Sequence, residues 1–427
     1  MPYRIAGIDV HKRMLAVVVS DVEVEGDYEF ERREFGSNPA QLRWLAEWLL
    51  EQQVEEVVME STAQYWKPVW GSLERYWKPI CQKREGARPK SGTLHLAQAQ
   101  SNRARRGRKS DFADAERLVK RLVANELVLS FVPDAEQRLW RTVTRTRYQL
   151  TRNQVQVHNR LEALLEEAHL KLSSLVSDLF GVSGRRMLKA LAEGETDPSA
   201  LAALAHHCLR ATPEQLSDAL GACRELNPLY RQLVGMALAE WERIQAQIRQ
   251  LDEGMAALLQ AHQDQVQRLT EVPGVGVNSA QQIVAEVGAT AASFPSGANL
   301  ASWVGACPGN EESAGVNYSH RSPKGNRHMR RILSQAANAA VRLKGSLFAV
   351  LYRRYVTRLG HNQTIGVIAH RLCRLIWKIL HQGVRYREFG PAVSQTSKHK
   401  RAARMIRQLR ALGYRVELAT PASDGGA

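Results

Sequence analysis

The sequence contains little cysteine and no long apolar run. Its five cysteines, Cys81, Cys208, Cys223, Cys307 and Cys373, are scattered and show no Cys-x-x-Cys spacing, which argues against a disulfide framework or a zinc ribbon. No apolar stretch reaches the roughly 20 residues that span a bilayer, and the N-terminus lacks the layout of a secretory signal. We therefore expect a cytoplasmic protein that does not enter a membrane.

Acidic residues are also in short supply. The 427 residues include 59 Lys and Arg but 43 Asp and Glu, so the formal charge is +16, while 44% of the residues are hydrophobic. A chain of this length can form two or three folded domains. Such a charge excess predicts a polyanionic partner. Nucleic acid is favoured over an anionic membrane surface, because arrayed Lys and Arg bind phosphates and release counterions.

The first part of the chain has the pattern of a mixed α/β domain. Residues 4–9, 14–20 and 28–35 are rich in β-formers and predict three antiparallel strands, 39–53 has a helical apolar period, and 54–60 returns to strand. We expect a helix at 68–77, a short strand at 79–84, and a further helix that begins at Asp111.

The middle of the chain is helical. Residues 136–172 have few helix breakers and an approximate apolar stripe, and residues 226–263 form a second helical stretch that could return alongside the first. Between them, 173–225 is helical but interrupted by Gly and Ser. The stripe fits an intramolecular bundle and a dimerising coiled coil equally well. The stripe consists of Leu139, Val143, Leu150, Val155, Leu161, Leu164 and Leu165.

A glycine-rich turn opens the last part of the chain. Pro273, Gly274 and Gly276 separate two helical stretches within residues 269–288, as in a helix-hairpin-helix. Such glycines let a backbone approach a phosphate, although a plain interhelical turn uses the same residues. Residues 347–380 predict two basic amphipathic helices, and a basic tail follows.

Four acidic residues stand where the predicted elements can bring them together. Asp9 ends the first strand on the same side as Gly7, Glu60 ends the strand at 54–60, and Asp111 and Asp114 lie one helical turn apart behind a basic run. If the two strands are neighbours, four carboxylates meet at one sheet edge, where they repel each other unless divalent cations separate them. The alternative is that Asp111 and Asp114 simply favour the start of a helix.

The order of these motifs resembles the IS110 family of bacterial insertion-sequence transposases. "GIDVHK", "MEST" and "KSDFADAERL" look like that family's DEDD tetrad, whose domain is similar to the RuvC Holliday-junction resolvases. Residues 300–333 resemble the family's second domain, which carries a nucleophilic serine; the matching residue is Ser313. Members commonly have glycines after that serine, whereas Ala314 follows here, so Ser319 and Ser322 are alternative nucleophiles.

The resemblance implies a DNA transposase or recombinase. It places the metal ligands, two Mg²⁺ ions, on Asp9, Glu60, Asp111 and Asp114, and a 5′-phosphoserine intermediate on Ser313. It also implies a nucleoid-associated homodimer that assembles into a tetramer and is directed to DNA by a structured guide RNA. The alternatives are a junction-resolving nuclease that uses water and a non-catalytic RNA- or DNA-binding scaffold.

The resemblance and the charge pattern together define four regions and a nucleic-acid surface. We expect a RuvC-like, ribonuclease-H-like catalytic domain at 1–128, a helical coiled-coil dimerisation region at 135–265, an α-helical serine transposase domain with a helix-hairpin-helix at 266–390, and a partly disordered tail at 391–427. A solvated surface is the alternative role for each basic residue. The expected nucleic-acid contacts are Arg103, Arg105, Arg106, Arg108, Lys109, Gly274, Gly276, His320, Arg321, Lys324, Arg327 and Arg330.

Overall fold

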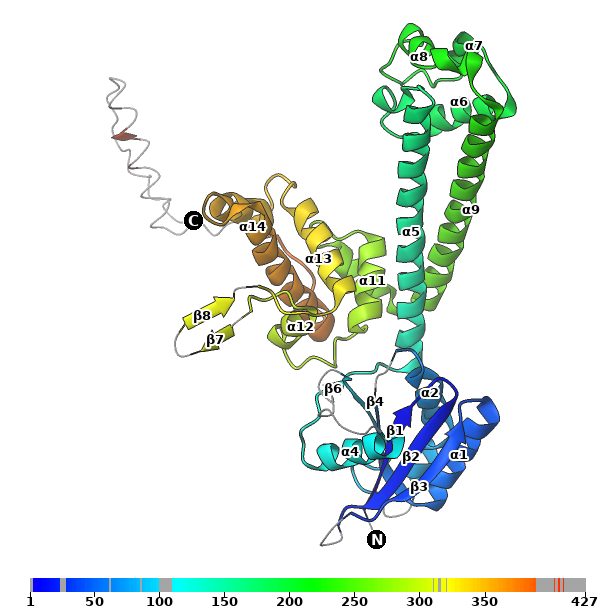
Figure 1. The fold of residues 1–427 in the computed structure, drawn as a ribbon. Coiled ribbons are helices and arrows are strands. Elements are labelled where there is room, and N and C mark those ends of the chain that lie inside the picture. The colour runs from blue at the N-terminus through cyan, green and yellow to red at the C-terminus, as the bar shows by residue number, and fades with distance from the viewer. Residues whose placement is uncertain are drawn as a thin grey trace. The chain divides into compact units, whose positions relative to one another are not determined.

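The computed structural model describes most of the chain. The described residues are 3–23, 28–60, 63–84, 87–99, 110–309, 311–313, 316–319 and 321–388, with isolated positions 403, 406, 407 and 410. For 311–313 and 316–319 the description covers the backbone alone. The basic run at 103–109, His320 and nearly all of the predicted tail lie outside these residues. The chain divides into two compact units, Met1–Ala135 and Glu136–Ala427 (Figure 1).

The first unit contains a mixed sheet with strand order β3-β2-β1-β4-β5-β6. Strands β1, β2 and β3 are antiparallel, β1, β4 and β5 are parallel, and β6 is antiparallel to β5. The predicted mixed α/β order and its three antiparallel strands are confirmed, although the strand expected from residue 28 begins at Glu31. The strands are β1 (Arg4–Val10), β2 (Met14–Asp21), β3 (Glu31–Gly36), β4 (Val54–Glu60), β5 (Thr93–Ala97) and β6 (Leu129–Ser130).

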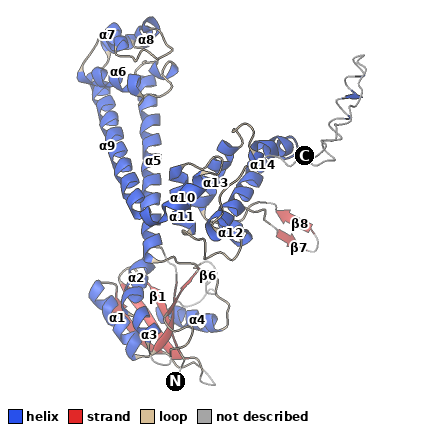
Figure 2. Ribbon diagram, turned by 180° about the vertical axis from the view of Figure 1, so that it is seen from behind, coloured by secondary structure: helices blue, strands red, loops and turns tan. Residues whose placement is uncertain are grey.

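Helices cover both faces of this sheet, so the side chains on both sides of its central strands are buried. Ala6 and Ile8 of β1 pack in the core beneath α1 (Pro39–Glu51), α2 (Trp66–Tyr76) and α3 (Lys78–Lys83). Ile5, on the opposite face, packs against α4 (Asp111–Val123). Figure 2 shows α4 apart from the helices of the other face. The helix predicted to begin at Asp111 is therefore confirmed.

The strand predicted at residues 79–84 is wrong, because this segment is helix α3. Pro79 lies in the first turn of the helix, where its fixed φ is favourable and its missing N–H costs nothing. Cys81 is buried there, and its thiol donates to the carbonyl oxygen of Val54 at 3.4 Å. The fifth strand of the sheet is instead β5, which the sequence pattern did not reveal.

The second unit begins with two long helices that run antiparallel. These are α5 (Ala135–Glu167) and α9 (Pro228–Leu258), which lie side by side in Figures 1 and 2. Arg147 on α5 donates to Asp252 on α9 at 3.0 Å. Further along the same two helices, Arg160 on α5 forms an ion pair with Glu240 on α9. The helical stretch at 226–263 is thus the returning partner of α5 within one chain.

The predicted apolar stripe on α5 is buried only in part. Leu161 and Leu165 are fully buried in the core at the far end of the helix pair, whereas Leu139 is 48% exposed and Val155 is 56% exposed. Short helices close that end, as the broken helical pattern predicted. They are η1 (Leu172–Ser174), α6 (Val182–Glu193), α7 (Pro198–Ala203), α8 (Pro213–Ala219) and η2 (Gly221–Glu225).

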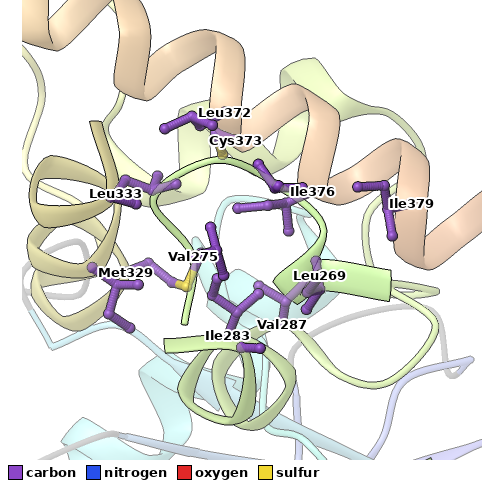
Figure 3. Packing of buried hydrophobic residues seen from close by; sticks show 14 of the residues in the cluster. Leu269, Val275, Ile283, Val287, Met329, Leu333, Leu372, Cys373, Ile376 and Ile379 are labelled. Carbon is purple, nitrogen blue, oxygen red and sulfur yellow. The ribbon is translucent and has the colours of Figure 1, made fainter. Parts of the chain in front are cut away.

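The rest of the second unit is helical around one large apolar core. Leu269, Val275 and Ile283 pack there against Met329 and other residues of the last two helices (Figure 3). The last helix is kinked at Gly360, where φ is 74°, so the two predicted helices are present. The elements are η3 (Gln260–His262), α10 (Gln263–Thr270), α11 (Val277–Val287), α12 (Gly297–Val304), β7 (Glu311–Ser313), β8 (Val316–Ser319), α13 (Arg327–Ala340) and α14 (Leu347–Gln382).

Within the described part of the chain, no helix has both the length and the apolar content that crossing a membrane requires.

Candidate active site

The acidic site is built on the close packing of α4 against β1. Side chains alternate along a strand, so Ile5, Gly7 and Asp9 share the face that α4 covers. A Cβ atom at Gly7 would lie 2.3 Å from the carbonyl oxygen of Ala115, a distance that no side chain can accommodate. Gly7 therefore allows α4 to approach the strand closely, and Asp111 lies one helical turn before Ala115.

Strand β4 places Glu60 beside the same site. It is the parallel neighbour of β1, with Gly7 opposite Val58 and Ile8 opposite Met59, so Glu60 follows next to Asp9. Val58 packs against Leu118 of α4, and alternation puts Glu60 on this same face of the sheet. Strands β1 and β4 are thus neighbours, which is the condition for Asp9 and Glu60 to lie at the same edge of the sheet.

The pKa of Asp9 depends on its burial and on the charged groups around it. Burial is the largest influence and raises the pKa of Asp9, which is 9% exposed; His11 lowers the pKa, and the charges of Asp114, Asp111 and Glu60 raise it. The net result is a pKa above the ordinary value of an Asp. Because all three acids act on Asp9, the structure brings the four predicted carboxylates into one neighbourhood.

His11 also belongs to this neighbourhood, and the sequence reasoning missed it. Its Nε2 atom lies 3.1 Å from Oδ2 of Asp9 and 3.3 Å from Oδ1 of Asp111. One potential ligand atom from each of these three residues lies within 4.8 Å of the others. The available signal was the spacing in "GIDVHK", since two residues after Asp9 alternation returns to the same face.

Asp111 and Asp114 stand in the first turn of α4, where the helix dipole favours negative charge. Ser110 precedes the helix but makes no side-chain capping bond. Asp114 accepts a hydrogen bond from Arg117 Nη1 at 2.7 Å, so it already has one cationic partner inside the unit. Asp111 and Asp114 therefore stabilise the start of α4 and also lie near Asp9, so the two interpretations of these acids do not exclude each other.

The serine predicted as a nucleophile lies in a short β-hairpin. Ser313 ends β7 and pairs with Val316, the first residue of β8, so it stands beside the connection between the strands. The alternative Ser319 pairs with Glu311 at the other end of the hairpin, and Ser322 is exposed beyond it. The three serines thus occupy different positions.

The two segments that lead into and out of this hairpin are held tightly together. A Cβ at Gly309 would lie 2.2 Å from the carbonyl oxygen of Arg321, and one at Gly325 would lie 2.4 Å from Val304. Arg330 donates to the carbonyl oxygens of Gly305, at 3.2 Å, and Pro323. Arg330, expected to bind phosphate, therefore holds the base of the hairpin.

The other predicted basic residues near the hairpin are arranged around its exit. Arg321, Lys324 and Arg327 are exposed, and Arg327 begins α13. His320 and the arginine run at 103–109 lie outside the described residues, as does the side chain of Ser313.

The glycine-rich turn joins α10 to α11, but its first glycine faces the protein. Gly274 has a φ of +83°, and a Cβ there would lie 2.2 Å from the carbonyl oxygen of Ala336 in α13. Gly276 caps α11 without a side-chain bond and has no atom within 4 Å of its Cβ position. Gly274 thus serves the packing of α13, and Gly276 leaves the start of α11 open.

A buried carboxylate connects α5, α11 and the hairpin. Glu286 on α11 is 1% exposed and accepts hydrogen bonds from Arg145 at 2.8 and 2.9 Å. Asn326 donates to the same carboxylate at 2.8 Å and caps α13 through its own oxygen. Burial raises the pKa of Glu286, but Arg145, Asn326 and Arg141 outweigh it, so the pKa is below its ordinary value. A charged residue in the apolar run "IVAEVG" was the available sequence signal.

Comparisons with known proteins identify the family. Residues 6–170 match a family model described as a DEDD transposase of the IS110 type, and residues 266–353 match the model of the transposase IS116/IS110/IS902 family. The chain belongs to this transposase family. The first stretch contains all four acids and the second contains the serine hairpin.

Two other proteins resemble parts of this chain. The 43.6 kDa protein of insertion element IS110 from Streptomyces coelicolor is 29% identical over 150 residues, which cover 35% of this chain and 36% of that protein. The Sinorhizobium fredii protein y4pF/y4sB, whose name describes it as a transposase, is 28% identical over 189 residues, which cover 43% of this chain and 48% of that protein. The similarity thus spans less than half of either relative.

Proposed function

We propose that this transposase cuts and rejoins DNA strands with its acidic site and the serine of its hairpin. The observation that carries the proposal is geometric: β4 places Glu60 beside the buried Asp9, and the first turn of α4 brings Asp111 and Asp114 to the same face of the sheet. The strand order, with three antiparallel strands followed by parallel ones, supports a RuvC-like, ribonuclease-H-like catalytic domain. The charge of +16 supports a nucleic-acid substrate.

The acidic donor set fits a divalent metal. Asp9, Glu60, Asp111 and Asp114 offer hard oxygen ligands. Burial first, and then the charges of Asp114, Asp111 and Glu60, raise the pKa of Asp9, and a bound cation would stabilise its charged form. We assign two Mg²⁺ ions to these four residues. Bound there, Mg²⁺ would supply positive charge to the oxygens of a phosphodiester during displacement. Asp9 and Glu60 would be held by the sheet, and Asp111 and Asp114 by α4.

The serine supplies the nucleophile. In the proposed step, Oγ of Ser313 forms a bond to phosphorus while the bond to the 3′-oxygen breaks. The serine hydroxyl proton leaves to a base or to solvent, and the departing 3′-oxygen takes up a proton from solvent. The products are a 5′-phosphoserine and a free 3′-hydroxyl end, so the phosphoester is retained for rejoining. Arg321, Lys324 and Arg327 lie near the hairpin and would balance phosphate charge.

The partners follow from the same family. We propose that DNA ends and a target site are the substrates, and that a guide RNA encoded by the element selects the target. A homodimer would assemble into a tetramer, with the helices α5 and α9 as a coiled-coil dimerisation region between the acidic and serine domains. The turn before α11 is proposed as a helix-hairpin-helix whose start contacts phosphate at Gly276. The acids and the serine lie in different units, so recombination requires that they meet on the DNA.

The experiment is covalent trapping on end-labelled DNA. Wild-type protein with Mg²⁺ should give an adduct to a 5′ end on denaturing gels, and peptide mapping should place it on Ser313. Ser313→Ala should bind DNA and lose the adduct, whereas a matched change of the exposed serine on α13, Ser334→Ala, should keep it. Asp9→Asn and Asp114→Asn should abolish cleavage.

Each outcome decides between the alternatives. An adduct that maps to Ser319 or Ser322 refutes the assignment of the nucleophile. Cleavage without any adduct supports a junction-resolving nuclease that uses water, and cleavage by Asp9→Asn or in excess EDTA refutes the metal site. Nucleic-acid binding with no cleavage by any form supports a scaffold.

A further inference from the structure

His11 lies among the four acids for a reason that is local to β1. The face that carries Gly7 and Asp9 continues to His11, the first residue after the strand. The backbone N–H of His11 donates to the carbonyl oxygen of Met14 at 3.1 Å, which closes the connection to β2. The backbone is therefore tied down, and the imidazole of His11 contacts the carboxylates of Asp9 and Asp111.

The spacing of these three side chains suits one metal ion. Nitrogen and oxygen ligands lie about 2.0–2.2 Å from a small divalent ion, so ligand atoms on opposite sides of it are about 4.2 Å apart. The ligand atoms of Asp9, His11 and Asp111 lie within 4.8 Å of one another. Small movements of these side chains would therefore place all three around a single ion.

We infer that His11 is a nitrogen ligand in the acidic site, in addition to the four carboxylates. The inference rests on the proposed metal site and specifies its chemistry. An imidazole ligand favours Mn²⁺ and later transition metals over Mg²⁺, whereas an all-oxygen site has less of this bias. His11 therefore sets the metal preference of the site, and its loss should weaken Mn²⁺ binding more than Mg²⁺ binding.

The experiment measures metal binding directly on the full-length protein. Mn²⁺ bound to the site should show nitrogen hyperfine coupling in electron spin echo envelope modulation, which reports an imidazole in the coordination shell. His206, His207 and Cys208 form a second group whose ligand atoms also lie within 4.8 Å, so the measurements use a His206→Asn/His207→Asn background.

Three variants in this background give the comparison. His11→Ala should abolish the nitrogen coupling and lower Mn²⁺ affinity by at least roughly tenfold, because even groups that only orient metal ligands cost about 10–100-fold when removed. Mg²⁺ affinity should fall less. Lys12→Ala changes the exposed next residue and should leave both affinities unchanged. Asp9→Asn should remove binding of both metals.

The outcomes separate this inference from the proposed function. Mn²⁺ that binds in an Asp9-dependent manner but shows no nitrogen coupling means that His11 is displaced, and it overturns the inference while leaving the metal site intact. Binding that Asp9→Asn does not alter overturns the metal site itself. Equal losses of Mn²⁺ and Mg²⁺ affinity in His11→Ala contradict a role in metal preference.

Discussion

Gly7→Ala should separate α4 from the sheet and disperse the acidic site. The added Cβ would lie 2.3 Å from the carbonyl oxygen of Ala115 and 2.8 Å from Cγ2 of Val119. Both distances are below the ordinary contact of about 3.5 Å, so α4 must retreat by roughly 1 Å at its closest point. Overpacking of this kind costs about 1–3 kcal/mol. Asp111 and Asp114 move with the helix, away from Asp9.

Hydrogen exchange on the full-length protein gives the local stability. Protection of the amides in α4 should fall by roughly 5- to 150-fold, the equivalent of about 1–3 kcal/mol. Divalent-metal binding, followed by calorimetry, should weaken in parallel, since a displacement of about 1 Å costs on the order of 100-fold where geometry is critical. A parallel loss of α4 protection and of metal affinity would show that the packing of α4 against β1 positions the acidic side chains.

A glycine in α2 provides the matched control. Gly71 has no atom within 4 Å of its Cβ position, and Gly71→Ala should stabilise the helix by up to about 1 kcal/mol through helix propensity. If Gly7→Ala retains wild-type protection in α4 and wild-type metal affinity, the close seating of α4 on β1 does not position the acids.

Other changes test the buried charges and the hairpin. Glu286→Ala should lower the stability of the second unit by about 1–3 kcal/mol in thermal unfolding, because Arg145 and Asn326 lose their shared acceptor while water can still solvate the half-exposed Arg145; a loss below about 0.5 kcal/mol would contradict this. The folded-state pKa of Glu286 is lowered, so its stabilisation is present above the ordinary value of 4.5 and is lost as pH falls through the folded pKa. Acid-induced loss of amide protection in α11 should therefore be weaker in Glu286→Gln. Asp9→Asn should raise the melting temperature in EDTA, since it removes a buried charge that its neighbours repel; a lower value would refute that. Arg330→Met should speed exchange at residues 321–326 and reduce adduct formation, and unchanged exchange would show that its two carbonyl contacts do not hold the hairpin.

Local pattern was sufficient for much of the fold. The alternation of β1 placed Asp9 on the side of Gly7, and the start of α4 at Asp111 followed from sequence composition. These features depend on neighbours within a few residues, so the chain itself specifies them. The same locality explains the error at residues 79–84, where a short apolar run suits a strand or a helix and Pro79 decided for the helix.

Only the tertiary structure decided which distant residues share a neighbourhood. The pairing of β1 with β4 brings Glu60 to Asp9, and Gly274 packs on α13. Arg145 forms an ion pair with the buried Glu286, which is 141 residues away in the sequence. Such contacts depend on how whole elements pack. A buried carboxylate is costly unless a cation pairs with it, and the tertiary packing determines which cation lies within reach. The place of His11 between two acids has the same origin: alternation set its face, and the docking of α4 supplied Asp111.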